Sequence, residues 1–110
     1  MNKDFLSEVI VKYGMDKQLD MCIEEMSELT KAICKFKRGV SKVAAEKNDD
    51  IKVIRMSELK KEISNIEEEV ADCEIMFEQI KIMFNCEDEV NEQIEFKLNR
   101  LKERLKNEKK

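Results

Sequence analysis

Two acidic stretches, Glu67-Glu68-Glu69-Val70-Ala71-Asp72 and Ile23-Glu24-Glu25-Met26-Ser27-Glu28, decide the fold of this chain. An offset of 44 residues aligns Glu25 with Glu69 and Glu28 with Asp72. At roughly 100° per residue, the apolar neighbours of each stretch fall between about 20° and 100° from Glu25 or Glu69, and Glu28 and Asp72 fall near −60°. Each stretch therefore predicts an amphipathic helix with two carboxylates on one edge of its apolar stripe. The stripes comprise Cys22, Met26, Leu29, Ile33 and Phe36 in the first helix, and Ile66, Val70, Cys73, Phe77, Ile80 and Phe84 in the second.

The position of these carboxylates favours a metal site. An unpaired carboxylate at the edge of a core costs several kcal/mol, so four of them need neutralisation. Residues three apart lie on one face of a helix, so Glu25 with Glu28 and Glu69 with Asp72 form two short pairs that can face each other if the helices pack side by side. An all-oxygen site of this kind favours Mg²⁺, Mn²⁺ or Ca²⁺ over zinc or copper.

Composition predicts an all-α fold, an antiparallel bundle of about four helices in one domain that covers residues 1–110. The chain has two glycines, no proline and 42% charged residues, which is typical of helices joined by few tight turns. A domain of this length has a modest core, and we expect it to form a homodimer or homotetramer.

We predict helices over residues 4–13, 16–38, 57–85 and 90–105, with an irregular connection at 40–55. Four aromatic residues are expected in the core: Phe36, Phe77, Phe84 and Phe96.

Charge is distributed unevenly along the chain. Residues 96–110 contain seven Lys/Arg and two Glu, whereas the chain as a whole has a net charge of −4. No broad basic surface is predicted, which argues against duplex nucleic acid as a partner and fits a small anion held between a metal and a few cations.

The four cysteines lack C-x-x-C spacing and the chain has no histidine, so we expect free thiols, with Cys22 and Cys73 buried, in a reducing cytoplasm. No stretch has the length of a signal peptide or a membrane span.

These residues resemble the MazG-like all-α nucleoside triphosphate pyrophosphohydrolases. Glu24-Glu25-Met26-Ser27-Glu28 and Glu69-Val70-Ala71-Asp72 are similar to the E-E-x-x-E and E-x-x-D motifs of that family, and Phe96-Lys97-Leu98-Asn99-Arg100 is similar to its lysine-and-arginine motif. The resemblance covers about residues 16–38 and 64–105. It implies that Glu25, Glu28, Glu69 and Asp72 hold Mg²⁺, with Mn²⁺ as a substitute, and that Lys97 and Arg100 contact phosphates. It also implies cleavage of a nucleoside triphosphate into a monophosphate and pyrophosphate, with the substrate bound between subunits.

Two departures from the family pattern affect this reading. The 40 residues between Glu28 and Glu69 exceed the usual distance between the motifs, so residues 40–55 are interpreted as an insertion or a partner-contacting element. Leu101 stands where a second cation often lies. Because the chain has no histidine, a general base must be a carboxylate or a metal-bound hydroxide, and Glu24 and Glu28 are both candidates.

A different class of function is also compatible with the sequence. The last predicted helix has Val90, Ile94, Leu98, Leu101 and Leu105 along one face. Such a stripe can pair with another chain, so the alternative to an enzyme is a non-catalytic helical interaction or oligomerisation module. A di-iron carboxylate bundle is disfavoured because its usual Glu-x-x-His pairs require histidine.

Overall fold

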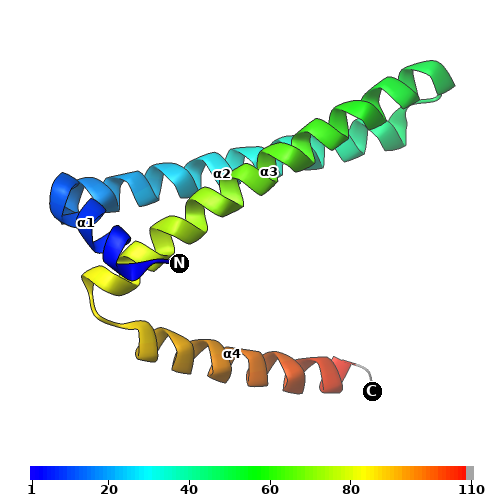
Figure 1. Cartoon of the computed structure of the whole chain (residues 1–110). Helices are drawn as coiled ribbons and strands as arrows, with labels where there is room; N and C mark the ends of the chain where they lie inside the picture. Colours follow the sequence, from blue (N-terminus) through cyan, green and yellow to red (C-terminus); the bar gives the residue numbers. More distant parts are fainter. Residues whose placement is uncertain (109–110) are drawn as a thin grey trace.

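The computed structural model describes residues 1–108 and is all-helical, which confirms the predicted fold class. Four helices follow one another along the chain: α1 (Lys3–Tyr13), α2 (Met15–Ala45), α3 (Asp49–Met83) and α4 (Glu87–Glu108). The long helices α2 and α3 form an antiparallel hairpin, α1 lies against the base of the hairpin, and α4 turns back after α3 (Figure 1). Among residues 1–108, no helix combines the length and the apolar character needed to cross a bilayer.

The ends of α1 are defined by two local features. Asn2 caps the N-terminus, and its side chain accepts a hydrogen bond from the Phe5 amide. Gly14 ends the helix as predicted, because its φ of 90° is open to glycine and its amide reaches the Ile10 carbonyl. The same glycine precedes α2, so Asp16 lies in the first turn of α2 and does not cap it.

A regular seam joins α2 and α3. Along most of both helices, from Gln18 in α2 and up to Met76 in α3, the less exposed residues recur at alternating intervals of three and four, which is the spacing of a coiled coil. In α2 the seam comprises Gln18, Cys22, Glu25, Leu29, Ala32, Phe36, Gly39, Val43 and, just after the helix, Glu46. In α3 it comprises Arg55, Leu59, Glu62, Ile66, Glu69, Cys73 and Met76. Cys22 and Cys73 are buried as predicted, and all four cysteines are free thiols.

The prediction of an irregular connection at residues 40–55 is wrong. Helix α2 continues through Gly39 to Ala45, and α3 begins at Asp49, so only residues 46–48 join them. Gly39 does not end the helix because it lies on the seam, where a Cβ atom would stand 2.7 Å from Leu59 Cδ2. The turn is held by Asn48, whose side chain caps α3 at the Ile51 amide, and by an ion pair of 3.1 Å between Arg55 and Glu46.

Helix α4 is weakly attached to the rest of the chain. Asn85 takes a φ of 49° in the break after α3, and an ion pair between Lys3 and Glu87 ties the start of α4 to α1. Among the described residues, α4 packs against α3 and not against α2, and a groove of about 560 Å³ separates the two helices near Phe77 and Val90.

The chain is consequently extended, with a Cα radius of gyration of 19.2 Å. A compact chain of this length has a radius of gyration of about 13 Å. Phe36 is half-buried, but Phe77, Phe84 and Phe96 are exposed, so the prediction that they lie in the core is wrong for the single chain. Their apolar stripes have no complete partner because α4 does not close a bundle over the hairpin.

Candidate metal centre

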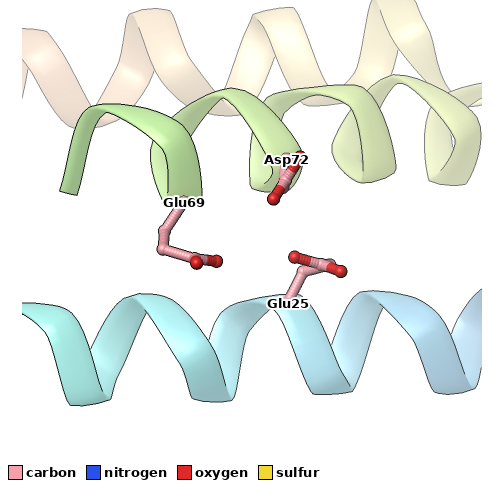
Figure 2. Close-up of side chains that lie close together, drawn as sticks. All are labelled: Glu25, Glu69 and Asp72. Carbon is pink, nitrogen blue, oxygen red and sulfur yellow. The ribbon is translucent and has the colours of Figure 1, made fainter. Parts of the chain in front are cut away.

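Three of the four predicted ligands lie together between α2 and α3. Glu25 projects from α2, and Glu69 and Asp72 project toward it from α3 (Figure 2). One carboxylate oxygen from each residue can be chosen so that all three lie within 4.8 Å of one another. The distance is short enough for one cation to contact all three carboxylates.

The antiparallel hairpin explains why distant residues meet. The 40 residues between Glu28 and Glu69 run out along α2 and return along α3, so they extend the hairpin beyond the carboxylates. Gln18 and Gln79 lie two turns from Glu25 and Asp72 on the side of the hairpin base, and a buried hydrogen bond of 2.8 Å joins their side chains. This pair aligns the helices beside the carboxylates. It was missed in the sequence, although Gln18 continues the seam spacing.

The environment of the cluster disfavours negative charge. Burial, followed by the charge of Asp72, raises the pKa of both Glu25 and Glu69 above the ordinary range for glutamate. Glu69 Oε2 is inaccessible to solvent and has no hydrogen-bond partner among the described residues. A buried carboxylate oxygen without a partner is costly, and a cation would relieve that cost.

The fourth predicted ligand, Glu28, lies beside the cluster and not in it. Its side chain is half-exposed and forms an ion pair of 3.3 Å with Lys31, one turn further along α2. The charge of Glu28 nevertheless contributes to the raised pKa of Glu69, so the two carboxylates are electrostatically coupled. Glu24, the other predicted general base, directly precedes Glu25 in α2 and is exposed.

The predicted phosphate contacts are not assembled with the carboxylates in one chain. Lys97 and Arg100 are exposed on α4, and the Arg100 guanidinium lies 5.9 Å from the centroid of the Phe96 ring. Among the described residues, α4 contacts α3 and, through the Lys3–Glu87 ion pair, α1, but it does not pack against α2, so these cations belong to a separate part of the molecule from Glu25. Their role at phosphates stays a prediction.

Searches with this chain against protein-family models, curated proteins and solved structures found no match. The resemblance to the MazG-like hydrolases therefore rests on the residues of the two acidic motifs and the basic motif alone. The fold and the site together define a helical hairpin with a three-carboxylate cluster between its two long helices.

Proposed function

We propose that this protein is a Mg²⁺-dependent nucleoside triphosphate pyrophosphohydrolase that releases pyrophosphate and a nucleoside monophosphate. The observation that carries the proposal is the convergence of Glu25, Glu69 and Asp72 within 4.8 Å, with Glu25 and Glu69 on a seam where apolar residues would pack better. A coiled-coil seam gains stability from apolar side chains. The seam acids Glu46 and Glu62 pair with Arg55 and Lys35, whereas Glu25 and Glu69 face each other with no ion pair among the described residues, which supports a use other than packing.

The residues fit a hard divalent cation. All three groups are carboxylates, which suit Mg²⁺ or Mn²⁺, and Glu69 Oε2 is a buried oxygen without a partner. In this proposal Glu25, Glu69 and Asp72 hold the cation and Glu28 completes the acidic set from the adjoining turn. The cation, when bound, polarises phosphate oxygens and acidifies water.

The protein's own residues have separate tasks in this proposal. Glu28 is half-exposed beside the cluster, where its carboxylate can accept a proton from a water molecule approaching the substrate. Glu24 is the alternative base, but its exposed position favours a solvated role. Lys97 and Arg100 supply positive charge to the phosphates, and since α4 lies away from α2, the cations come from a second copy of the chain.

A non-catalytic helical interaction module is the second candidate function. It is favoured by the exposed apolar side chains of α4, among them Ile94, Leu98, Leu101 and Leu105. In that case the acidic cluster has no ligand, and replacing it with neutral residues leaves the protein's properties intact or raises its stability.

One experiment separates the two candidates. The purified protein is incubated with a panel of ribo- and deoxyribonucleoside triphosphates and Mg²⁺, and pyrophosphate release is measured. We expect release from at least one nucleotide, loss of that activity in Glu25→Gln/Glu69→Gln, and retention in the matched control Glu67→Gln/Glu68→Gln, whose side chains are exposed. Release from no nucleotide would reject the enzyme and leave the interaction module.

A further inference from the structure

A row of cations follows the carboxylate cluster along α2 toward the turn at residues 46–48. Residues that directly precede seam residues lie on one side of the hairpin, and Glu28 in α2 and Asp72 in α3 are both of this kind. A step back from the seam leads to the same side on both helices, because α2 and α3 face each other and run in opposite directions (Figure 1). Beyond Glu28, the next four α2 residues of this kind are all basic: Lys31, Lys35, Arg38 and Lys42.

Three of these cations border a hollow between the two long helices. The hollow has a volume of about 200 Å³ and lies toward the turn from the cluster. Lys35 Nζ lies 3.6 Å from a carboxylate oxygen of Glu62, whereas Arg38 and Lys42 form no ion pair among the described residues. Four cations and two acids line the hollow, which leaves a net charge of +2: Lys35, Arg38, Lys42, Arg55, Glu58 and Glu62. The hollow is therefore suited to an anion.

The direction of α2 aims its cations at the cluster. The Cα–Cβ bonds of a helix tilt toward its N-terminus, so a side chain covers the turn before its own Cα atom. In α2 that direction leads from the turn back toward Glu25. Lys35 and Arg38 lie seven and ten residues beyond Glu28, or about 10 and 15 Å along the helix axis, and their long side chains lean into that gap. Lys61 of α3 is on the same side but leans the opposite way, toward the turn.

The other end of the cluster, toward the hairpin base, is apolar. Met21 in α2 and Ile75 in α3 directly precede seam residues there. Ile75 borders an apolar hollow of about 240 Å³ against α1. The next α2 residue of this kind, Lys17, has its ammonium over the Tyr13 ring, 5.1 Å from the ring centroid. A charged phosphate in an apolar hollow would lose its hydration without gaining a partner. The surroundings of the cluster therefore give a bound phosphate chain a preferred direction.

We propose that the leaving pyrophosphate points along α2 toward the 46–48 turn, where Lys35 and Arg38 hold it. The inference rests on the proposed function, because it assumes that the bond between the α- and β-phosphates lies at the carboxylate cluster. In hydrolysis the water oxygen bonds to the α-phosphorus, the bond from that phosphorus to the bridging oxygen breaks, and pyrophosphate leaves with the electron pair while Glu28 takes the water proton. Negative charge grows on the leaving group during this step, and nearby cations stabilise it. These two cations belong to the same chain as the carboxylates and add to Lys97 and Arg100.

Product inhibition tests the direction, because each product occupies one part of the site. The full chain is assayed with a nucleotide that it cleaves and with Mg²⁺ in excess over pyrophosphate. In Lys35→Gln/Arg38→Gln we expect inhibition by pyrophosphate to weaken at least about tenfold, because two charged donors are lost. Inhibition by the nucleoside monophosphate should stay within about twofold of the unaltered protein, since that product does not reach these cations.

The matched control is Lys37→Gln/Lys60→Gln, which also removes two exposed cations. Both residues directly follow seam residues, so they lie on the other side of the hairpin. In this control, inhibition by either product should change by less than about twofold. Far-UV circular dichroism verifies that both double variants stay helical.

The possible failures are distinguishable. Unchanged pyrophosphate inhibition in Lys35→Gln/Arg38→Gln, or equal weakening in the control, would overturn the assignment of these cations while leaving the enzyme intact. Weaker inhibition by the monophosphate alone would mean that the phosphate chain runs in the opposite direction. Pyrophosphate release from no nucleotide would reject the proposed function and this inference together.

Discussion

The hydrogen bond between Gln18 and Gln79 offers a sharp test of the hairpin alignment. The Gln18 amide donates to Gln79 Oε1 at 2.8 Å, and the two residues are only 6% and 3% exposed. Replacing Gln79 with leucine keeps the volume but removes the acceptor, so the Gln18 N–H is left buried without this partner. Leaving a buried donor unsatisfied costs about 1 to 3 kcal/mol.

The double variant Gln18→Leu/Gln79→Leu has a different expected result. With both polar groups replaced by apolar groups of similar shape, the change in the free energy of unfolding should be near zero or stabilising. The cycle formed by the two single variants and the double variant therefore predicts a coupling energy of more than about 1 kcal/mol. Urea denaturation at one fixed protein concentration, followed by far-UV circular dichroism, measures it.

Additive effects in this cycle would refute the reasoning. If the two single losses simply summed in the double variant, Gln18 and Gln79 would not be in contact and α2 and α3 would be aligned differently. Because Gln18 lies two turns before Glu25 and Gln79 two turns after Asp72, the carboxylate cluster would then lose its structural support as well.

Three further predictions concern titration, catalysis and the turn. Glu25 and Glu69 have raised pKa values in the folded chain, so the stability tied to their protons is present below the ordinary glutamate pKa of about 4.3 and is lost as pH rises through the raised values. Unfolding measured across pH without divalent cations should show this loss of stability. The variant Glu25→Gln/Glu69→Gln should no longer show the pH dependence. In the pyrophosphate assay, Glu28→Gln should lower kcat at least about tenfold, whereas the control Glu24→Gln should lower it by less than about twofold. An equal loss of kcat in the two variants would contradict the assignment of Glu28 as the general base. Asn48→Ala should lower the free energy of unfolding by about 1 kcal/mol because it removes the cap on the Ile51 amide. Asn48→Asp keeps the acceptor oxygen and is the control. A loss as large in Asn48→Asp would contradict the capping role of Asn48.

Much of the fold was predictable because the apolar spacing of α2 and α3 is strong. The angular positions of Glu25, Glu69 and Asp72 were enough to predict that they face one another once the helices pair. Helix ends were less predictable. Gly39 resembled a helix stop, but its lack of a side chain serves close packing against Leu59. The segment Ile51-Lys52-Val53-Ile54 was predicted to be part of an irregular connection. Its three β-branched residues are exposed, yet the helix α3 runs through it.

The rest could not be predicted because it depends on packing across the chain. Glu28 shares the helical angle of Asp72, but its position next to Lys31 leaves it in an ion pair at the surface. Lys97 and Arg100 are placed by the break at Asn85, and the direction of a helix after such a break is not encoded in its own periodicity. The aromatic residues Phe77 and Phe84 were expected in a core that a single copy does not complete.

Calorimetric titration with Mg²⁺ tests the central claim most directly, since it asks whether the carboxylate cluster holds a cation. We expect the unaltered protein and the control Glu67→Gln/Glu68→Gln to bind Mg²⁺ with the same affinity. The variant Glu25→Gln/Glu69→Gln should bind at least about tenfold more weakly, because it loses two charged oxygen ligands. Equal binding by all three proteins, or binding by none, would contradict the assignment of Glu25, Glu69 and Asp72 as a metal centre.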